Sequence, residues 1–328
     1  MLRMPPFDLH RPATSDEAFR LATELPDAMY VAGGTDLLPN LKHGLHDAKH
    51  LIGLSHLSEL VGISLLDDGT LRIGAGTSLH DVATSELVHN EAPAIAISTG
   101  MVAGPQHRRM GTIGGNVMLD TRCLFYNQSA PWRKALGFCL KREGDLCHVI
   151  DSKTACVAAH SSDSVPALMA LDAQVELIAE GGRQTFSLRD AFTQDGRFER
   201  MLSFSRQSLL VAVLVPPRPA GHRSTYRKIR TRESVDFPQL GIAVAAGFDG
   251  DVVTGLDAVV SAVMPRPKVL KHMTKAVGTK LDDAMIEVLS DHAYKQTKPQ
   301  DSLHGSAQWR REMARVEMRR ALLELRGQ

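Results

Sequence analysis

Cysteine is missing from most of this 328-residue sequence, and all four cysteines lie between Cys123 and Cys156. Long apolar runs are missing too: no stretch of about 18 apolar residues occurs, so we expect no transmembrane helix. The opening MLRMPPFDLH has no apolar core of a secretory signal. We therefore expect a cytoplasmic protein. In that compartment, clustered cysteines more often bind metal or react than form disulfides.

The chain also lacks an excess of positive or negative charge, and it has few aromatic residues. The net charge is +1 and aromatics make up 5% of the chain, so we expect neither a nucleic-acid nor a membrane partner. The sequence contains no nucleophilic triad pattern, paired carboxylates or H-E-x-x-H, and we predict no catalytic residues. The 14 histidines are scattered. Those near the motifs discussed below are expected to pack or to face solvent: His107, His148 and His160.

The remaining pattern is that of a mixed α+β protein with more than one subdomain. A helix is predicted to start at Thr14 and a strand to cover residues 28–32. Residues 81–103 read as helical with a break at Pro93. From Leu209 the pattern changes to a strand meander with a hairpin signal at Asp249-Gly250-Asp251, and helices are expected beyond Lys268.

Two glycine-rich motifs are candidate phosphate-binding turns. AGGTDLL (32–38) follows the strand at 28–32, and GTIGGN (111–116) lies about 80 residues further on. Consecutive backbone N–H groups in such turns form concavities that bind anions, and a diphosphate is the obvious ligand. Neither motif is G-x-G-x-x-G or lies in a clear βαβ unit, so a Rossmann site is not expected. Taken singly, either motif is more often an ordinary tight turn, and the pair in this order is more specific.

The two motifs, followed by Ser162-Asp163 before an apolar helix, resemble the FAD-binding medium subunits of molybdenum hydroxylases, the family of xanthine dehydrogenase and carbon monoxide dehydrogenase. The resemblance runs from about residue 7 to about residue 326. It implies the vanillyl-alcohol-oxidase (PCMH) type of fold, with two α+β subdomains around FAD and a C-terminal domain of a three-stranded sheet and helices. The expected divisions are 1–60, 61–220 with an inserted loop at 122–158, and 221–328.

The same resemblance assigns cofactor contacts by position. The FAD diphosphate is expected against the first turn, with a second cradle in the other motif. Asp163 is expected to accept from a ribose hydroxyl, and Lys228 to lie near the flavin, although a solvated strand-edge lysine explains Lys228 equally well. The two cradles consist of Ala32, Gly33, Gly34, Thr35 and Asp36, and of Thr112, Gly115 and Asn116. Arg108 and Arg109 could contact FAD phosphates or a partner subunit.

The four cysteines, Cys123, Cys139, Cys147 and Cys156, are candidate metal ligands. No C-x-x-C occurs among them, which disfavours a zinc ribbon, a bacterial ferredoxin run and a thioredoxin-type pair. Four thiolates suit either a [4Fe–4S] cluster or a zinc ion, and residue chemistry alone leaves both open.

A second resemblance concerns this segment. DTRCLFYNQS, GFCLK, GDLCHVI and CVAAHSSD are similar to the inserted loop of the β subunits of 4-hydroxybenzoyl-CoA reductases, which carries a [4Fe–4S] cluster. It implies that all four cysteines bind that cluster. The nearby aromatic residues would shield it, or would simply pack the loop: Phe125, Tyr126, Trp132 and Phe138.

The resemblances imply an electron-transfer subunit with FAD and [4Fe–4S]. Expected partners are a large molybdopterin subunit and a small subunit with two [2Fe–2S] clusters, in a dimer of heterotrimers. The expected reaction is reductive dehydroxylation of an aromatic CoA thioester, with electrons entering from a donor such as ferredoxin at the [4Fe–4S] cluster. Two alternatives stay open: the same subunit in an oxidative molybdenum hydroxylase, and a zinc-stabilised binding protein.

Overall fold

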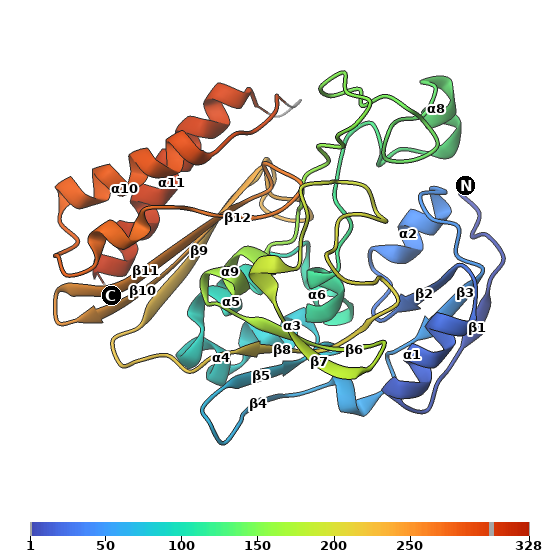
Figure 1. Cartoon of the computed structure of the whole chain (residues 1–328), viewed down its shortest axis with the longest axis horizontal. Coiled ribbons are helices and arrows are strands. Elements are labelled where there is room, and N and C mark those ends of the chain that lie inside the picture. Colours follow the sequence, from blue (N-terminus) through green and yellow to red (C-terminus); the bar gives the residue numbers. More distant parts are fainter. Residues whose placement is uncertain (1, 302–304, 328) are drawn as a thin grey trace.

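The computed structural model describes residues 2–301 and 305–327. Three β-sheets organise the chain. Figure 1 shows the N-terminal sheet and the C-terminal sheet at opposite ends of the molecule, with the five-stranded sheet and its helices between them. This mixed α/β architecture confirms the predicted fold class.

The N-terminal sheet is a parallel βαβαβ unit with strand order β1-β3-β2. The expectation that AGGTDLL lies outside a βαβ unit is therefore wrong, since that motif joins β2 to α2 and β2 pairs with β3 in parallel. The crossover helix spans only six residues and contains Pro39, so it shows too little periodicity to be recognised in the sequence. The elements are β1 (Asp8–His10), α1 (Ser15–Glu24), β2 (Ala28–Val31), α2 (Leu37–Lys42) and β3 (His50–Gly53).

The middle region is an antiparallel five-stranded sheet with order β4-β5-β8-β6-β7. As predicted, Pro93 breaks the helical stretch, because it occupies the first turn of a new helix. The strands are β4 (Ile63–Leu65), β5 (Leu71–Gly74), β6 (Gln174–Ala179), β7 (Gly182–Ser187) and β8 (Leu209–Val215). The helices are η1 (Ser58–Leu60), α3 (Leu79–Thr84), α4 (Glu86–Glu91), α5 (Pro93–Gly100), α6 (Pro105–Met110), α7 (Ile113–Val117), α9 (Ser164–Ala170) and η2 (Leu188–Asp190).

The cysteine segment lies between α7 and α9 and is built mainly of turns, with one short helix, α8 (Ala130–Ala135). Isolated β-bridges stabilise this segment, and two of them pair Arg122 with Ala159 and Cys147 with Ser152. In Figure 1 this segment extends from the body of the molecule on the side of α2.

The C-terminal region is an antiparallel sheet covered by two long helices. The resemblance implied three strands, whereas a two-residue strand at the edge makes a fourth. The predicted hairpin at Gly250 joins the two longest strands. The elements are β9 (Arg223–Ile229), β10 (Leu240–Asp249), β11 (Val252–Ser261), β12 (Lys268–Val269), η3 (Met273–Ala276), α10 (Asp283–Gln296) and α11 (Ala307–Gly327).

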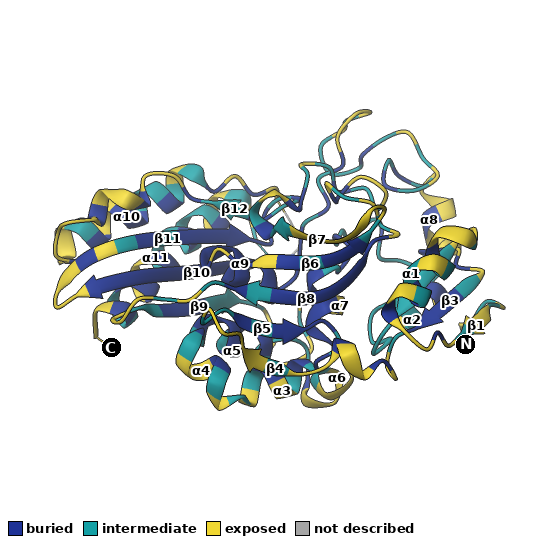
Figure 2. Ribbon diagram, turned by 60° about the horizontal axis from the view of Figure 1, so that its bottom comes forward, coloured by how far each residue is buried: buried dark blue, intermediate teal, exposed yellow. Residues whose placement is uncertain are grey.

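Separate apolar cores stabilise these regions. Figure 2 shows β8 and β10 buried along most of their length. The largest core joins the five-stranded sheet to α5 and α9, and a second joins α10 and α11 to the C-terminal sheet. A third core packs α1 and β3 against Ile178, Leu209 and Val211 of the five-stranded sheet. This contact fixes the N-terminal unit beside the middle region, and the main cavity lies between the two.

Candidate functional site

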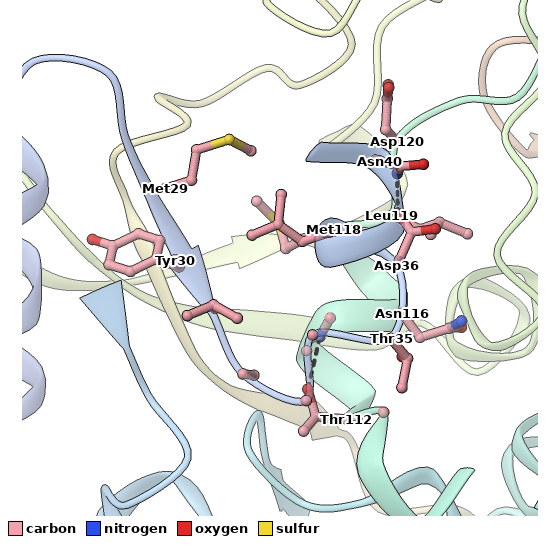
Figure 3. A pocket seen from close by; sticks show the side chains of 18 of the residues that line it. Met29, Tyr30, Thr35, Asp36, Asn40, Thr112, Asn116, Met118, Leu119 and Asp120 are labelled. Carbon is pink, nitrogen blue, oxygen red and sulfur yellow. Dashed lines mark hydrogen bonds between the residues drawn. The ribbon is translucent and has the colours of Figure 1, made fainter. Parts of the chain in front are cut away.

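A cavity of about 650 Å³ runs between the N-terminal unit and the five-stranded sheet. That volume lies within the range of pockets for cofactor-sized ligands. Both glycine motifs line it, together with Asp163. Figure 3 shows its labelled side chains coming from two stretches, residues 29–40 and residues 112–120. Every residue predicted to contact FAD lines this cavity except Lys228, which contacts Asp163 instead.

The first glycine turn is held tightly against the second. A Cβ on Gly33 would lie 1.7 Å from the carbonyl oxygen of Met110, so the two backbones meet there and only glycine fits. Gly34 has a φ of +70°, the left-handed region that favours glycine. Asp36 accepts a hydrogen bond from Asn40 Nδ2 at 2.8 Å. The turn thus presents its backbone to the cavity in a fixed shape.

The second glycine motif begins the short helix α7. Thr112 Oγ1 accepts from the backbone N–H of Gly115 at 3.1 Å, so this hydroxyl caps the helix. Asn116 Oδ1 accepts from Ser162 Oγ at 2.8 Å, from Ser164 Oγ at 2.6 Å and from Ser164 N at 3.2 Å. Both side chains line the cavity. Their oxygens also accept hydrogen bonds within the protein, and through these bonds Asn116 positions the loop that carries Asp163.

Asp163 and Lys228 contact each other. Lys228 Nζ lies 2.7 Å from Asp163 Oδ2, and Tyr226 donates its hydroxyl to Asp163 Oδ1 at 2.7 Å. Lys228 also donates to the carbonyl of Met101 at 3.1 Å, and its side chain is 0% exposed. Burial raises the pKa of Asp163 and lowers that of Lys228, while their attraction opposes both shifts. Lys228 is therefore a buried partner of Asp163, and the solvated-lysine interpretation is wrong.

Two partly buried arginines that no sequence motif pointed to also line the cavity, Arg122 and Arg206. Arg122 forms an ion pair with Asp36 and stacks over Phe237 at 4.5 Å, and its Nε has no hydrogen-bond partner among the described residues. Arg206 lies 3.2 Å over the ring of Phe198. Burial lowers the pKa of each to about 10, so both remain cations at neutral pH. An anionic ligand suits this cavity, because cations and backbone turns both face it.

A smaller cavity lies on the other side of residues 120–126. Its walls include all four cysteines, together with Phe125, Tyr126, Lys141 and His148. Burial raises the pKa of the Cys123 thiol, and raises that of Cys156 to about 11. Phe125 stacks with His148 at 5.4 Å, whereas Trp132 is 39% exposed and does not line this cavity. Of the four aromatic residues that were expected to shield a cluster, Phe125 and Tyr126 line this cavity.

The four sulfurs do not converge on one point. Within residues 2–301 and 305–327, no three Cys, His, Asp or Glu side chains are arranged to hold a single metal ion. A tetrahedral zinc site needs sulfurs about 3.8 Å apart, since each lies about 2.3 Å from the metal. A cubane cluster spaces its ligands more widely, because each cysteine binds a different iron. The cavity that the four cysteines share has a volume of about 10 Å³, room for about one water molecule.

Three side chains of the cysteine segment anchor it to the N-terminal unit. Tyr126 donates its hydroxyl to the carbonyl of Leu45 at 3.0 Å, and Arg142 Nη1 donates to the same oxygen at 2.5 Å. Arg133 Nη2 donates to the carbonyl of Gly44 at 2.6 Å. Leu45 itself lines the large cavity. The cysteine segment is thus attached at the edge of that cavity.

Arg108 and the three histidines near the motifs have the following positions in the structure. Arg108 Nη1 donates to the carbonyl of Val102 at 2.9 Å, which ties α6 to the cavity wall. His160 is fully buried against Phe192, and burial lowers its pKa to about 3. His107 lines the large cavity and His148 the smaller one. Among the described helices, none combines the length and the apolar character needed to span a bilayer.

The fold and the large cavity together define a nucleotide-cofactor subunit of the flavin-binding class. Comparison with known families is specific: residues 5–218 match the FAD-binding domain in molybdopterin dehydrogenase, and residues 224–325 match the CO dehydrogenase flavoprotein C-terminal domain. The chain therefore belongs to the family of FAD-binding subunits of the molybdenum hydroxylases. It is an oxidoreductase subunit with FAD as its cofactor.

Individual relatives agree with this assignment. The chain is 35% identical to the aldehyde oxidoreductase FAD-binding subunit PaoB of Escherichia coli strain K12, over 75% of this chain and 79% of that one. It is 30% identical to the carbon monoxide dehydrogenase medium chain of Afipia carboxidovorans, over 96% and 95%. The solved structure of Cu,Mo-CO dehydrogenase superposes with a TM-score of 0.80 at 27% identity, covering 99% of both chains.

Proposed function

We propose that this chain is an electron-transfer subunit that carries a [4Fe–4S] cluster in addition to FAD. The observation that carries the proposal is the cavity shared by Cys123, Cys139, Cys147 and Cys156 beside the large cavity. None of the relatives named above is described as having an iron–sulfur cluster in this subunit, so the cysteine site extends beyond the family assignment. When bound, FAD exchanges electrons in pairs or singly and the cluster exchanges them singly.

The two glycine turns are the proposed holders of the FAD diphosphate. Ala32 to Asp36 supply consecutive backbone groups on one side, and Thr112, Gly115 and Asn116 line the other side. Arg122 adds a cation at this surface. Asp163 has both carboxylate oxygens engaged, yet each oxygen has a second lone pair for a ribose hydroxyl. Lys228 acts through Asp163 by holding its carboxylate in place.

The proposed partners are a large molybdopterin subunit and a small subunit with [2Fe–2S] clusters, in a dimer of heterotrimers. Two observations support them: the matched family model names a molybdopterin dehydrogenase, and several relatives are named as medium chains or FAD-binding subunits of larger enzymes. The substrate pocket would then lie on another chain. A pull-down from native cells followed by molybdenum analysis tests this: a complex without molybdenum contradicts it.

For the complete enzyme we propose reductive dehydroxylation of 4-hydroxybenzoyl-CoA or a related aromatic thioester, with ferredoxin as electron donor. This rests on the similarity of the cysteine segment to those reductases. The purified complex should consume the thioester when reduced ferredoxin is supplied, and Cys139→Ser should abolish electron entry from ferredoxin. If Cys139→Ser accepts electrons from ferredoxin at the wild-type rate, the cysteine site is not the entry port.

An oxidative reaction is the second candidate, and the 35% identity to an aldehyde oxidoreductase subunit favours it. In that case the complex oxidises an aldehyde or a heterocycle and passes electrons outward. The same preparation distinguishes the two candidates: aldehyde-dependent reduction of an artificial acceptor, without turnover of the CoA thioester, supports the oxidative enzyme. The zinc-stabilised binding protein is opposed by the family assignment, because the chain matches the FAD-binding domain of an oxidoreductase family over residues 5–218.

A further inference from the structure

The large cavity and the cysteine cavity share one wall. Asp120 and Arg122 line the large cavity, and the next residue, Cys123, lines the smaller one. Leu45 lines the large cavity and packs with Tyr126, Cys123 and Cys139 around the smaller one. Leu45 and residues 120–126 therefore form a wall that borders both cavities, and a charge within this wall acts on both.

Lys141 is a buried cation of this wall. Lys141 lines the cysteine cavity, its side chain is 1% exposed, and its ammonium lies 4.6 Å from the centre of the Tyr126 ring. Lys141 Nζ lies 2.7 Å from Asp120 Oδ1, and Asp120 faces the large cavity. The Asp120–Lys141 pair therefore reaches from one cavity to the other.

The remaining contacts of Lys141 are with neutral oxygens. Nζ lies 3.0 Å from the carbonyl of Thr121 and 2.8 Å from the carbonyl of Gly196, and it also contacts Thr121 Oγ1. These acceptors satisfy the hydrogens of the ammonium, whereas Asp120 is the one carboxylate within ion-pair distance of it among residues 2–301 and 305–327. Burying a lysine ammonium removes it from water at a large cost in desolvation. A negatively charged occupant of the cysteine cavity would offset that cost.

We propose that Lys141 is the fixed countercharge of the cysteine site, and that through Asp120 it sets the reduction potentials of the two centres relative to each other. The inference rests on the proposed [4Fe–4S] cluster, whose four thiolates make it an anion that becomes more negative on reduction. A cation in the cavity wall stabilises the reduced form most. Lys141 is thus a positioning residue for electron transfer, with no contact to a substrate.

The test is a redox titration of the full chain, purified anaerobically with its cofactors, followed by EPR and visible absorption. Lys141→Met should move the cluster potential to a more negative value, because a cation is lost. Asp120→Asn should move it to a more positive value, because Lys141 is no longer neutralised, and should raise the flavin potential as well. Lys268→Met is the matched control, a partly buried lysine that donates to the carbonyl of Gln296 in the C-terminal region, and should shift neither potential.

Each outcome of the titration supports or overturns the role inferred for Lys141. Iron and sulfide in the wild-type chain, with cluster potentials unchanged in both Lys141→Met and Asp120→Asn, would overturn this inference and leave the proposed cluster intact. A wild-type chain without iron and sulfide would overturn the proposed cluster and the inference with it. If Lys141→Met fails to incorporate the cluster, incorporation by Lys141→Arg supports the need for a cation. If Lys141→Arg fails too, the direction of the Asp120→Asn shift decides.

Discussion

Asp163 and Lys228 form a buried ion pair, with Nζ 2.7 Å from Oδ2, at the edge of the FAD cavity. The two residues come from different parts of the fold, since Asp163 precedes α9 and Lys228 lies on β9. The pair therefore ties the C-terminal sheet to the wall of the cofactor site. The carboxylate proposed to contact the ribose of FAD is therefore also the one that holds β9 in place.

The first prediction concerns the energetics of this pair. Lys228→Met should lower the free energy of unfolding by about 3–5 kcal/mol, because it leaves the buried Asp163 carboxylate unpaired. The double variant Asp163→Asn, Lys228→Met should cost less than the sum of the single variants. Urea unfolding of the four proteins measures the coupling, and additive costs would contradict the ion pair.

The second prediction concerns the contact between the two glycine turns. Gly33→Ala places a methyl group against the carbonyl of Met110, so we expect destabilisation of about 3 kcal/mol or more and loss of bound FAD. Gly255→Ala is the matched control, because a Cβ there meets nothing within 4 Å. Flavin content and thermal unfolding check both variants. Wild-type FAD content in Gly33→Ala would refute the close approach.

The third prediction concerns Asn116, which positions the loop of Asp163. Asn116→Leu removes the acceptor of three hydrogen bonds from Ser162 and Ser164. We expect a loss of about 2 kcal/mol or more in stability, because buried donors are left unpaired, together with weaker FAD binding. Asn116→Asp keeps the oxygen and should retain more of both. Equal effects of the two substitutions would show that these hydrogen bonds do not matter.

The fourth prediction concerns acid stability. Burial lowers the pKa of His160 to about 3 and that of His46 to about 4, whereas an unfolded chain protonates histidine near pH 6.5. Their neutral rings therefore favour the folded state fully above pH about 6.5, and this contribution is lost as the pH falls toward 4. The loss reaches at most about 1.4 kcal/mol per pH unit for each histidine.

His160→Leu should make the stability less dependent on pH between 4 and 6.5. The exposed His89, changed to Gln, serves as control and should leave the slope unchanged. Chemical unfolding at a series of pH values gives the slopes, and identical slopes for His160→Leu and wild type would contradict the buried neutral ring.

Local signals predicted much of this molecule. The cap at Thr14, the Pro93 break and the Gly250 hairpin depend on a few adjacent residues, and the structure has all three. Arg122, Arg206 and the Asp120–Lys141 pair were missed because their roles arise from burial and from partners distant in sequence. The short helix α2 was missed because six residues show too little periodicity.

The most direct test of the account is the cofactor content of the chain purified without oxygen. Wild type should contain FAD together with four iron atoms and four sulfides per chain, and Cys139→Ser should keep its FAD while losing iron and sulfide. A wild-type chain that contains FAD but zinc in place of iron, or no metal at all, would contradict the proposed cluster.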